Sequence, residues 1–217
     1  MEILYSDKRI LVAVKPCGVL STDEPGGMPE LLRQELGDPQ ACVRTVHRLD
    51  RVVGGVMVFA RSRMAASILS EQMRNRQFCK QYLAIVHGRM EPTCGQMTDL
   101  LLRDTYAGRT VMVQQPGKGV QAAELSYRVL AYQGGLSLVK ITLGTGRTHQ
   151  IRVQFASRGT PLVGDGKYGA QDHEKTIGLF SHSLTFPHPR DGSEMTFSAL
   201  PGDELFADAL RAAGLTP

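Results

Sequence analysis

Hydrophobic residues recur along the chain in short runs, and polar or glycine-containing turns separate these runs. Runs of this length that are rich in Val, Ile and Leu predict β-strands. They occupy residues 3–5, 10–14, 54–60, 78–88, 123–131, 136–143, 183–186 and 194–199. Helices are predicted where apolar residues recur at helical spacing, or where a proline or a capping residue marks a start. They cover residues 29–36, 62–75, 148–157 and 203–213.

Some helix ends carry local signals. Thr148 is predicted to cap the helix that runs to Ser157, and Gly214 lies in the C′ position behind the last helix. Residues 91–118 are interrupted by glycine and proline and are predicted to be hairpin or loop material that links two halves. Many strands with interspersed helices, and no regular βαβ alternation, predict an α+β fold. We expect a mixed, largely antiparallel β-sheet with flanking helices.

The composition is that of a soluble globular protein, with 42% hydrophobic and 21% charged residues among 217. That length fits one elaborated domain or two closely joined lobes. No run approaches the roughly 20 apolar residues that cross a bilayer. The first ten residues, MEILYSDKRI, contain no apolar signal segment, so we expect a cytoplasmic protein with no membrane partner.

The cysteines and the charge add little that is specific. The four cysteines at 17, 42, 79 and 94 form no CxxC pair, so they predict buried or incidental thiols and no metal site. The net charge of +4 and the pI near 9.0 are mild. Of 25 basic residues 7 are lysine, which leaves 18 arginines. Arginine suits phosphates and bases, so this bias is compatible with a nucleic-acid partner.

Two segments combine reactive side chains with glycine: HRLDR at 47–51, followed by two glycines, and GTGRTHQIR at 144–152. Asp50 lies between two arginines, which favour its charged form, and it leads into an apolar run; we therefore expect a nucleophilic carboxylate at a strand edge. The second segment places donors on a turn and on a helix start, where a phosphate or a partner carboxylate would bind. On spacing alone, a solvated salt bridge is favoured for Asp50, and a tight turn before a helix is favoured for the second segment.

These segments resemble signature sequences of the RluA-type pseudouridine synthases. HRLDRVVGGVMVFAR resembles the first signature, and GRTHQIRVQFASRGTPLVGDGKYG resembles the second. Three more segments match in order, so the resemblance spans roughly residues 8 to 200: KPCGVLS at 15–21, KQYLAIVHG at 80–88 and LFSHSLTFPHP at 179–189. It implies that residues 1–217 form a single pseudouridine synthase catalytic domain in two closely joined lobes. No separate N-terminal S4-like domain is expected.

The resemblance also implies roles for individual residues. Asp50 would be the catalytic aspartate, Tyr82 would lie against the target uracil, and Arg147 would pair with Asp50 and hold it ionised. Arg48 matches the arginine that enters the RNA helix as the target base flips out. Other matched positions would support the pocket or brace its loops: Ile151, Arg152, His47, Leu49, His149 and Gln150. His188 is expected to be a packing residue.

The chemistry implied by the resemblance fits these residue types. Isomerisation breaks the C1′–N1 bond of uridine and rejoins the base through C5, which needs a carboxylate, a proton relay and a pocket that retains the base. The base must first leave its stack. No metal or cofactor is expected. Whether Asp50 attacks C1′, adds to C6 or acts as base in a glycal route stays open.

The chain departs from the family pattern at two places. Val53 and Gly54 stand where Thr and Ser commonly precede the family's glycine, which is Gly55 here. Gln154 stands where a histidine often follows I-R-V. The first change removes a hydroxyl near the active-site loop, and neither change affects Asp50.

Two other classes of function stay open. A protein that binds RNA without modifying it would not need Asp50, Tyr82 and Arg147, yet all three are present. A nucleoside or glycoside hydrolase would need a second carboxylate, for which the candidates are Asp99, Asp104 and Asp165. For the synthase, the expected partner is a stem-loop of ribosomal or transfer RNA, with ribosomal RNA slightly favoured and a monomer as the acting form.

Overall fold

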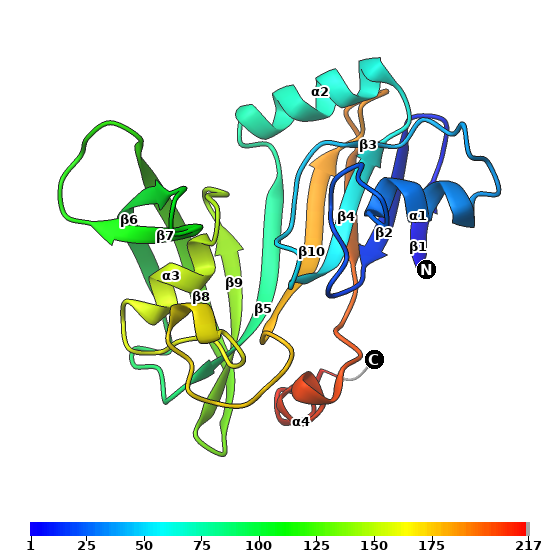
Figure 1. Ribbon diagram of the computed structural model, residues 1–217. Coiled ribbons are helices and arrows are strands. Elements are labelled where there is room, and N and C mark those ends of the chain that lie inside the picture. The colour runs from blue at the N-terminus through cyan, green and yellow to red at the C-terminus, as the bar shows by residue number, and fades with distance from the viewer. Residues whose placement is uncertain (216–217) are drawn as a thin grey trace. The chain divides into compact units, whose positions relative to one another are not determined.

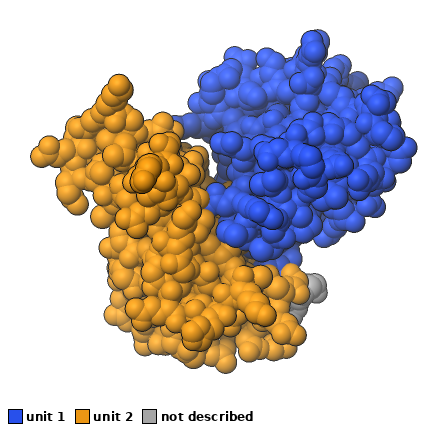
Figure 2. Space-filling view, in the orientation of Figure 1, with its two compact units in different colours: residues 1–80, 180–201 blue, residues 81–179, 202–217 orange. Residues whose placement is uncertain are grey.

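The structure, a computed structural model, describes residues 1–215 (Figure 1). The chain divides into two compact units (Figure 2). The first unit comprises residues 1–80 and 180–201, and the second comprises residues 81–179 and the chain from Gly202 onward. The prediction that residues 91–118 link two halves is wrong, because this segment lies wholly inside the second unit. The chain passes between the units at three places instead: within strand β5 (Cys79–His87), at the start of strand β10 (Leu179–Pro187) and between Pro201 and Gly202.

The first unit is built around a strand that is buried along its whole length. This strand, β4, spans Gly54–Ala60, and all seven of its residues are buried, which explains its uninterrupted apolar run. The strand order is β1-β2-β4-β10, with β3 also on β4 and β11 on β10. The pairing of β4 with β10 is parallel, and the other pairings are antiparallel. The remaining elements of this unit are β1 (Ile3–Ser6), β2 (Ile10–Lys15), α1 (Met28–Glu35), β3 (Arg44–Thr45), α2 (Arg63–Arg74), β10 (Leu179–Pro187) and β11 (Glu194–Ser198).

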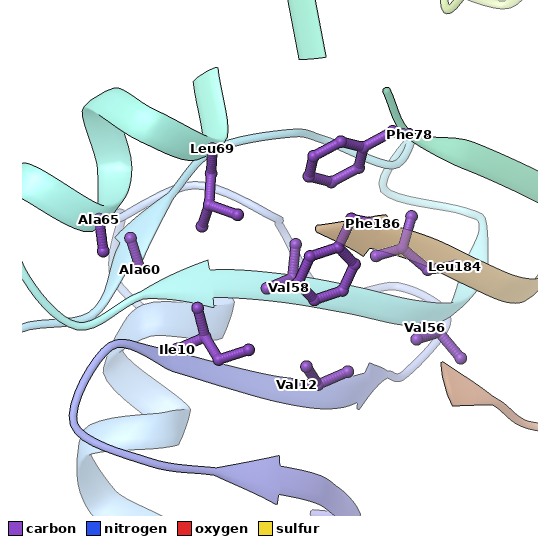
Figure 3. Close-up of a cluster of buried hydrophobic side chains, with 10 residues drawn as sticks. All are labelled: Ile10, Val12, Val56, Val58, Ala60, Ala65, Leu69, Phe78, Leu184 and Phe186. Atoms are coloured by element: carbon purple, nitrogen blue, oxygen red, sulfur yellow. The ribbon is translucent and has the colours of Figure 1, made fainter. Parts of the chain in front are cut away.

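Helix α2 packs against one face of this sheet (Figure 3). Ser62 starts the helix, since its hydroxyl accepts a hydrogen bond from the amide of Ala65 at 3.1 Å. Leu69 of the helix and Val58 of β4 belong to one buried cluster, to which β2 and β10 also contribute. Phe186 of β10 stacks on Phe78 with ring centroids 5.2 Å apart. Alternate residues of each strand therefore form the core, as a period of two requires.

The second unit is built on a sheet of five strands, of which β6 and β8 are the longest. Its order is β5-β9-β8-β6-β7, and the β6–β7, β6–β8 and β8–β9 pairs are antiparallel. Residues 91–118 supply β6 and β7, so the hairpin that their composition suggested is present. The elements are β5 (Cys79–His87), β6 (Cys94–Asp104), β7 (Arg109–Val113), β8 (Val120–Gln133), β9 (Leu136–Leu143), α3 (Gln150–Ala156), a 3₁₀ turn η1 (Gly166–Tyr168) and α4 (Glu204–Ala212).

The predicted α+β class with a mixed, largely antiparallel sheet is confirmed. The last helix has the predicted ends: Asp203 caps α4 through the amide of Phe206, and Gly214 follows with a φ of 69°. Within residues 1–215, no helix combines the length and the apolar composition that crossing a membrane would require.

Candidate active site

Asp50 lies in the loop of residues 46–53, which joins β3 to β4 and is called the Asp50 loop below. Asp50 is half-buried, and its carbonyl accepts a hydrogen bond from the amide of Val53 at 2.9 Å, so the loop turns tightly before β4 begins. Arg51 joins this turn to the segment after β2. Its carbonyl accepts from the amide of Gly18 at 2.8 Å, and its Nε donates to the Gly18 carbonyl at 2.9 Å. The arginine that follows Asp50 therefore braces the loop.

The three residues before Asp50 differ in burial. His47 is buried, and its Nε2 accepts a hydrogen bond from the amide of Val58 in β4 at 3.1 Å. Burial lowers the pKa of His47 to about 3, so its imidazole is neutral and available as an acceptor. Leu49 is also buried, whereas Arg48 between them is exposed. His47 and Leu49 thus anchor the loop in the first unit and leave Arg48 at its surface.

Ser21 anchors the Asp50 loop from the other side. Its hydroxyl donates to the carbonyl of Leu49 at 2.9 Å and accepts from the amide of Leu49 at 3.0 Å. Both backbone groups of the residue before Asp50 are therefore bound by a single buried side chain. This arrangement restricts the backbone at the position that presents the carboxylate.

Lys15 is the functional residue that sequence reasoning did not identify. It ends β2 and is completely buried, and its Nζ donates to the carbonyls of Pro16 at 2.9 Å, Val19 at 2.6 Å and Arg51 at 3.1 Å. Burial lowers its pKa to about 8, although the nearby charges of Cys17 and Asp50 act in the opposite direction. Lys15 therefore fastens the residue after Asp50 and places a cationic group in its electrostatic environment. The sequence signals were a lysine at the end of an apolar run and its place at the start of the matched segment KPCGVLS, and neither indicated its contacts.

The two glycines at the start of β4 allow close contact with neighbouring backbone. Gly55 has a φ of 125°, and a Cβ there would lie 2.3 Å from the carbonyl oxygen of Ser181 in β10. A Cβ on Gly54 would lie 3.2 Å from the Lys15 carbonyl, a tighter contact than side chains usually make. The departure from the commoner Ser at position 54 thus removes a side chain where β2 and β4 approach closely.

In the second unit, Arg147 lies in the turn before α3. Its amide donates to Oε1 of Gln150 at 3.0 Å, and its Nε donates to the carbonyl of Ala122 in β8 at 2.9 Å. Thr145 also donates its hydroxyl to Oε1 of Gln150 at 2.8 Å, while Nε2 of Gln150 donates to the carbonyl of Glu124 at 3.0 Å. Gln150 therefore holds the turn to β8, as its expected bracing role requires.

The prediction that Thr148 caps α3 is wrong. The helix begins at Gln150, and the residue at its N-cap position is His149, with a left-handed φ of 54°. The amide of Arg147 donates its hydrogen bond to the side chain of Gln150, and the carbonyl of Thr148 accepts one from the hydroxyl of Thr110 at 2.9 Å. These side-chain bonds fold the turn in place of a threonine cap. They also occupy one of the amides that we expected to hold a phosphate or carboxylate.

Arg152 of α3 forms a buried ion pair with Asp165. Its Nε and Nη2 donate to the two carboxylate oxygens at 2.8 and 2.7 Å, and its guanidinium lies 5.1 Å from the ring centre of Tyr168. The Tyr168 hydroxyl in turn lies 2.8 Å from Nδ1 of His149 and accepts from the amide of Thr110 at 2.8 Å. Asp165 thus has the structural role that its place in the sequence suggested, and Arg152 ties α3 to the following loop.

The remaining predicted residues of the second unit are buried. Tyr82 lies in β5 with 8% of its surface exposed, and Ile151 lies in α3 with 4% exposed. The structure therefore groups the predicted residues into two sets. His47, Arg48, Leu49 and Asp50 share one loop of the first unit, and Tyr82, Arg147, Ile151 and Arg152 belong to the second.

The acids that a hydrolase would need have other partners. Asp99 accepts from Arg158 at 3.0 and 3.1 Å and from Gln154 at 2.7 Å, and Asp104 accepts from the amide of Ala107 at 2.8 Å. Like Asp165, they belong to the second unit. Each of these carboxylates stabilises a local structure.

Over residues 1–215, no three His, Cys, Asp or Glu side chains gather as metal ligands would. Of the two alternatives predicted for the cysteines, buried or incidental thiols, the first is wrong, because all four are exposed. Cys17 and Cys42 lie in loops, while Cys79 and Cys94 are the first residues of strands, where burial is least complete.

Sequence comparison relates the chain to RNA-modifying proteins. Residues 9–157 match the family described as RNA pseudouridylate synthase. Ribosomal large subunit pseudouridine synthase C of Haemophilus influenzae is 33% identical over 211 residues, which are 91% of this chain and 64% of that protein. The uncharacterized RNA pseudouridine synthase YlyB of Bacillus subtilis is 33% identical over 215 residues, covering 94% and 70%. The chain thus spans roughly two thirds of the length of these relatives, and less than two thirds of the first.

Solved structures show the same fold. Human RNA Pseudouridylate Synthase Domain Containing 4 superposes with a TM-score of 0.80 at 24% identity, covering 100% of this chain and 94% of that one. Human RNA Pseudouridylate Synthase Domain Containing 1 gives a TM-score of 0.77 at 23% identity, covering 97% and 94%. The family match includes the Asp50 loop and the Arg147 turn, which were the two segments that carried the predicted chemistry. The chain belongs to the RNA pseudouridylate synthase family.

Proposed function

We propose that this protein is an RNA pseudouridine synthase that isomerises one or a few uridines in folded RNA, with Asp50 as its catalytic carboxylate. The observation that carries the proposal is the family match over residues 9–157, which contains Asp50 within HRLD. The anchoring of the Asp50 loop by Lys15 and Ser21 supports it, because a reacting carboxylate must be held in a fixed position.

Under this proposal three further residues take part in binding and catalysis. Tyr82 lies against the target uracil and assists proton transfer, Arg147 pairs with Asp50, and the exposed Arg48 enters the RNA as the base flips out. Ile151, Arg152, His47 and Leu49 support the pocket. The reaction exchanges the C1′–N1 bond for a C1′–C5 bond; the hydrogen on C5 leaves as a proton, and N1, released from the sugar, takes up a proton. No metal, cofactor or redox partner is required for that balance.

The proposed substrate is a stem-loop of ribosomal RNA, with transfer RNA as the second choice. The name of the Haemophilus relative favours ribosomal RNA. The mild positive charge of the chain is compatible with either RNA. We propose that residues 1–217 work as a single catalytic domain, as a monomer in the cytoplasm, and that this domain itself recognises the RNA.

The proposal is tested in vitro with ribosomal RNA that carries tritium at C5 of its uridines, prepared from cells that lack the gene. The wild type is expected to release tritium to water, because C5 exchanges its hydrogen for the sugar carbon. Asp50→Asn is expected to lower the rate at least about 100-fold. Asp208→Asn, which changes an exposed acid of α4, is the matched control and should stay within about twofold of the wild type.

Each alternative function predicts a different fate of the tritium label. A hydrolase would release labelled free uracil, and a protein that only binds RNA would release no label in any variant. Equal tritium release by Asp50→Asn and the wild type would refute the catalytic role of Asp50.

The proposed role of Arg147 is tested with two substitutions that separate the effect of its charge from that of its planar guanidinium group. Arg147→Met should lose most activity, and Arg147→Lys should recover part of it, because lysine restores the charge but not the planar fork. Equal activity of the two variants would contradict an electrostatic role for Arg147. Melting temperatures of both variants report whether the bond to the Ala122 carbonyl matters for folding instead.

A further inference from the structure

The first unit contains an open groove of about 600 Å³, which is within the size range of ligand sites. It is lined by two segments that are distant in sequence: the loop after Ser21, and residues 39–45, which lead into the Asp50 loop. Arg33 of α1 lines it as well. The residues that matter for the argument are Thr22, Asp23, Arg33, Cys42, Arg44 and Thr45.

The charges of the groove favour an anion. Arg33 donates two hydrogen bonds to the carboxylate of Asp23, at 2.8 and 2.7 Å, and a third to the carbonyl of Ala41 at 3.1 Å. The charges of Arg33 and Asp23 therefore balance, and their contact holds the two walls together. Arg44 is exposed and has no ion pair within residues 1–215, so its charge is the one left uncompensated in the lining.

The groove is directly coupled to the backbone that presents Asp50. Thr45 donates its hydroxyl to the carbonyl of Ser21 at 2.8 Å. The hydroxyl of the same Ser21 bonds both backbone groups of Leu49. Ser21 thus connects the wall of the groove to the residue before Asp50, entirely within the first unit. A ligand in the groove would lie beside the loop that carries the reacting carboxylate.

We infer that this groove binds an unpaired segment of the substrate RNA next to the target uridine. The inference rests on the proposed function and adds a second RNA subsite to it. A phosphate contacts Arg44, and the exposed edges of unpaired bases meet the polar side chains of Thr22 and Gln40. The lining comes wholly from residues 22–45 and contains no aromatic side chain, so charge and hydrogen bonding hold the strand in place of stacking.

The exposed cysteines provide a direct test. Cys42 lines the groove, Cys17 lies 3.0 Å from the carbonyl of Val52 in the Asp50 loop, and Cys94 starts β6 in the second unit. Rates of alkylation by iodoacetamide would be measured by mass spectrometry on the full chain. The probe is deproteinised ribosomal RNA from cells that lack the gene. We expect this RNA to slow alkylation of Cys42 and Cys17 at least about fivefold and that of Cys94 less than about twofold.

The pattern of protection separates the two claims. If Cys17 is protected while Cys42 reacts at its original rate, the groove is empty in the complex and the inference is overturned, although the proposed function stands. If neither cysteine is protected and the same RNA yields no tritium release, the proposed function fails together with the inference. Protection of both cysteines supports the inference.

A charge variant gives an independent measurement. Arg44→Gln is expected to weaken RNA binding about threefold to tenfold, and to reduce the slope of log affinity against log salt by nearly one, as the loss of one phosphate contact predicts. Arg63→Gln, an equally exposed arginine at the start of α2, is the matched control. The inference is overturned if the two variants bind RNA with the same affinity and the same salt slope.

Discussion

At the scale of single residues, Lys15 fastens the backbone of the residue that follows Asp50. Its ammonium group donates hydrogen bonds to three carbonyl oxygens, which take the place of water. One of these oxygens belongs to Arg51, 36 positions away in the chain. The sequence places this lysine at the end of a strand, but only the folded chain brings the second and third acceptors to it. For this reason the resemblance identified the segment around Lys15, whereas its role came from the structure.

The protonation of Lys15 gives a stability prediction. Its pKa is 10.5 when unfolded and about 8 when folded, so between these values the unfolded chain binds more protons. The stability contributed by this group therefore rises with pH from about 8 to 10.5. We expect the advantage of the wild type over Lys15→Met, in free energy of unfolding, to grow by at most roughly 3 kcal/mol over this range.

Urea unfolding of both proteins at pH 7.5 and pH 10 measures this change. Groups that titrate alike in the two proteins cancel in the difference. A difference that is constant with pH would show that the folded lysine keeps its ordinary pKa. A difference that shrinks as the pH rises would show that the charged form is favoured in the folded protein, so that its pKa is raised there.

At the scale of elements, local patterns predicted most of the secondary structure. The apolar run 54–60 is β4 over the same residues, and the helix expected at 62–75 is α2 with Ser62 and Asn75 as its caps. Both predictions succeeded because their signals lie in neighbouring residues. An uninterrupted apolar run indicates a strand that is buried on both faces, and a serine before an apolar helical pattern indicates a helix start. The prediction for the start of α3 was wrong because that start depends on the side chain of Gln150 and on the left-handed backbone of His149, which take the place of the expected threonine cap.

The start of β4 tolerates no side chain at Gly55. Gly55→Ala would place a Cβ within 2.6 Å of three atoms of Ser181, in a left-handed region of φ that alanine rarely adopts. We expect a loss of at least about 3 kcal/mol in unfolding free energy, or no folded protein. Thermal or urea unfolding measures the loss.

Gly192→Ala is the matched control for the backbone conformation alone. Gly192 has a φ of 73° and no atom within 4 Å of an added Cβ, so the expected loss is about 1 kcal/mol. Equal losses in the two variants would show that the close approach of β4 and β10 does not determine the cost.

At the scale of the whole molecule, sequence patterns could not predict which strands are neighbours. Strand β10 pairs with β4 in parallel although more than 100 residues separate them, and its register places Ser181 opposite Gly55. No local signal encodes such a pairing, because it arises from surfaces that meet only in the folded chain. The boundary between the two expected lobes was also placed wrongly, since residues 91–118 resemble a connection but form strands of the second unit.

Function, by contrast, could be predicted at this scale. Asp50 and Arg147 by themselves fitted a solvated ion pair and a tight turn, and only the ordered series of motifs along the chain indicated the chemistry. The family match over residues 9–157 confirms the family and leaves the roles of Asp50, Tyr82 and Arg147 as predictions. Experiments on the whole protein with its RNA are therefore required to assign these roles.

The most direct test is pseudouridine mapping of total RNA from cells with and without the gene, complemented by the wild type or by Asp50→Asn. We expect one or a few pseudouridines, in ribosomal RNA first, to disappear on deletion and to return only with the wild type. Equal abundance of the two proteins on immunoblots is the control for folding. Sites that return equally with Asp50→Asn, or no pseudouridine that depends on the gene, would contradict the central claim.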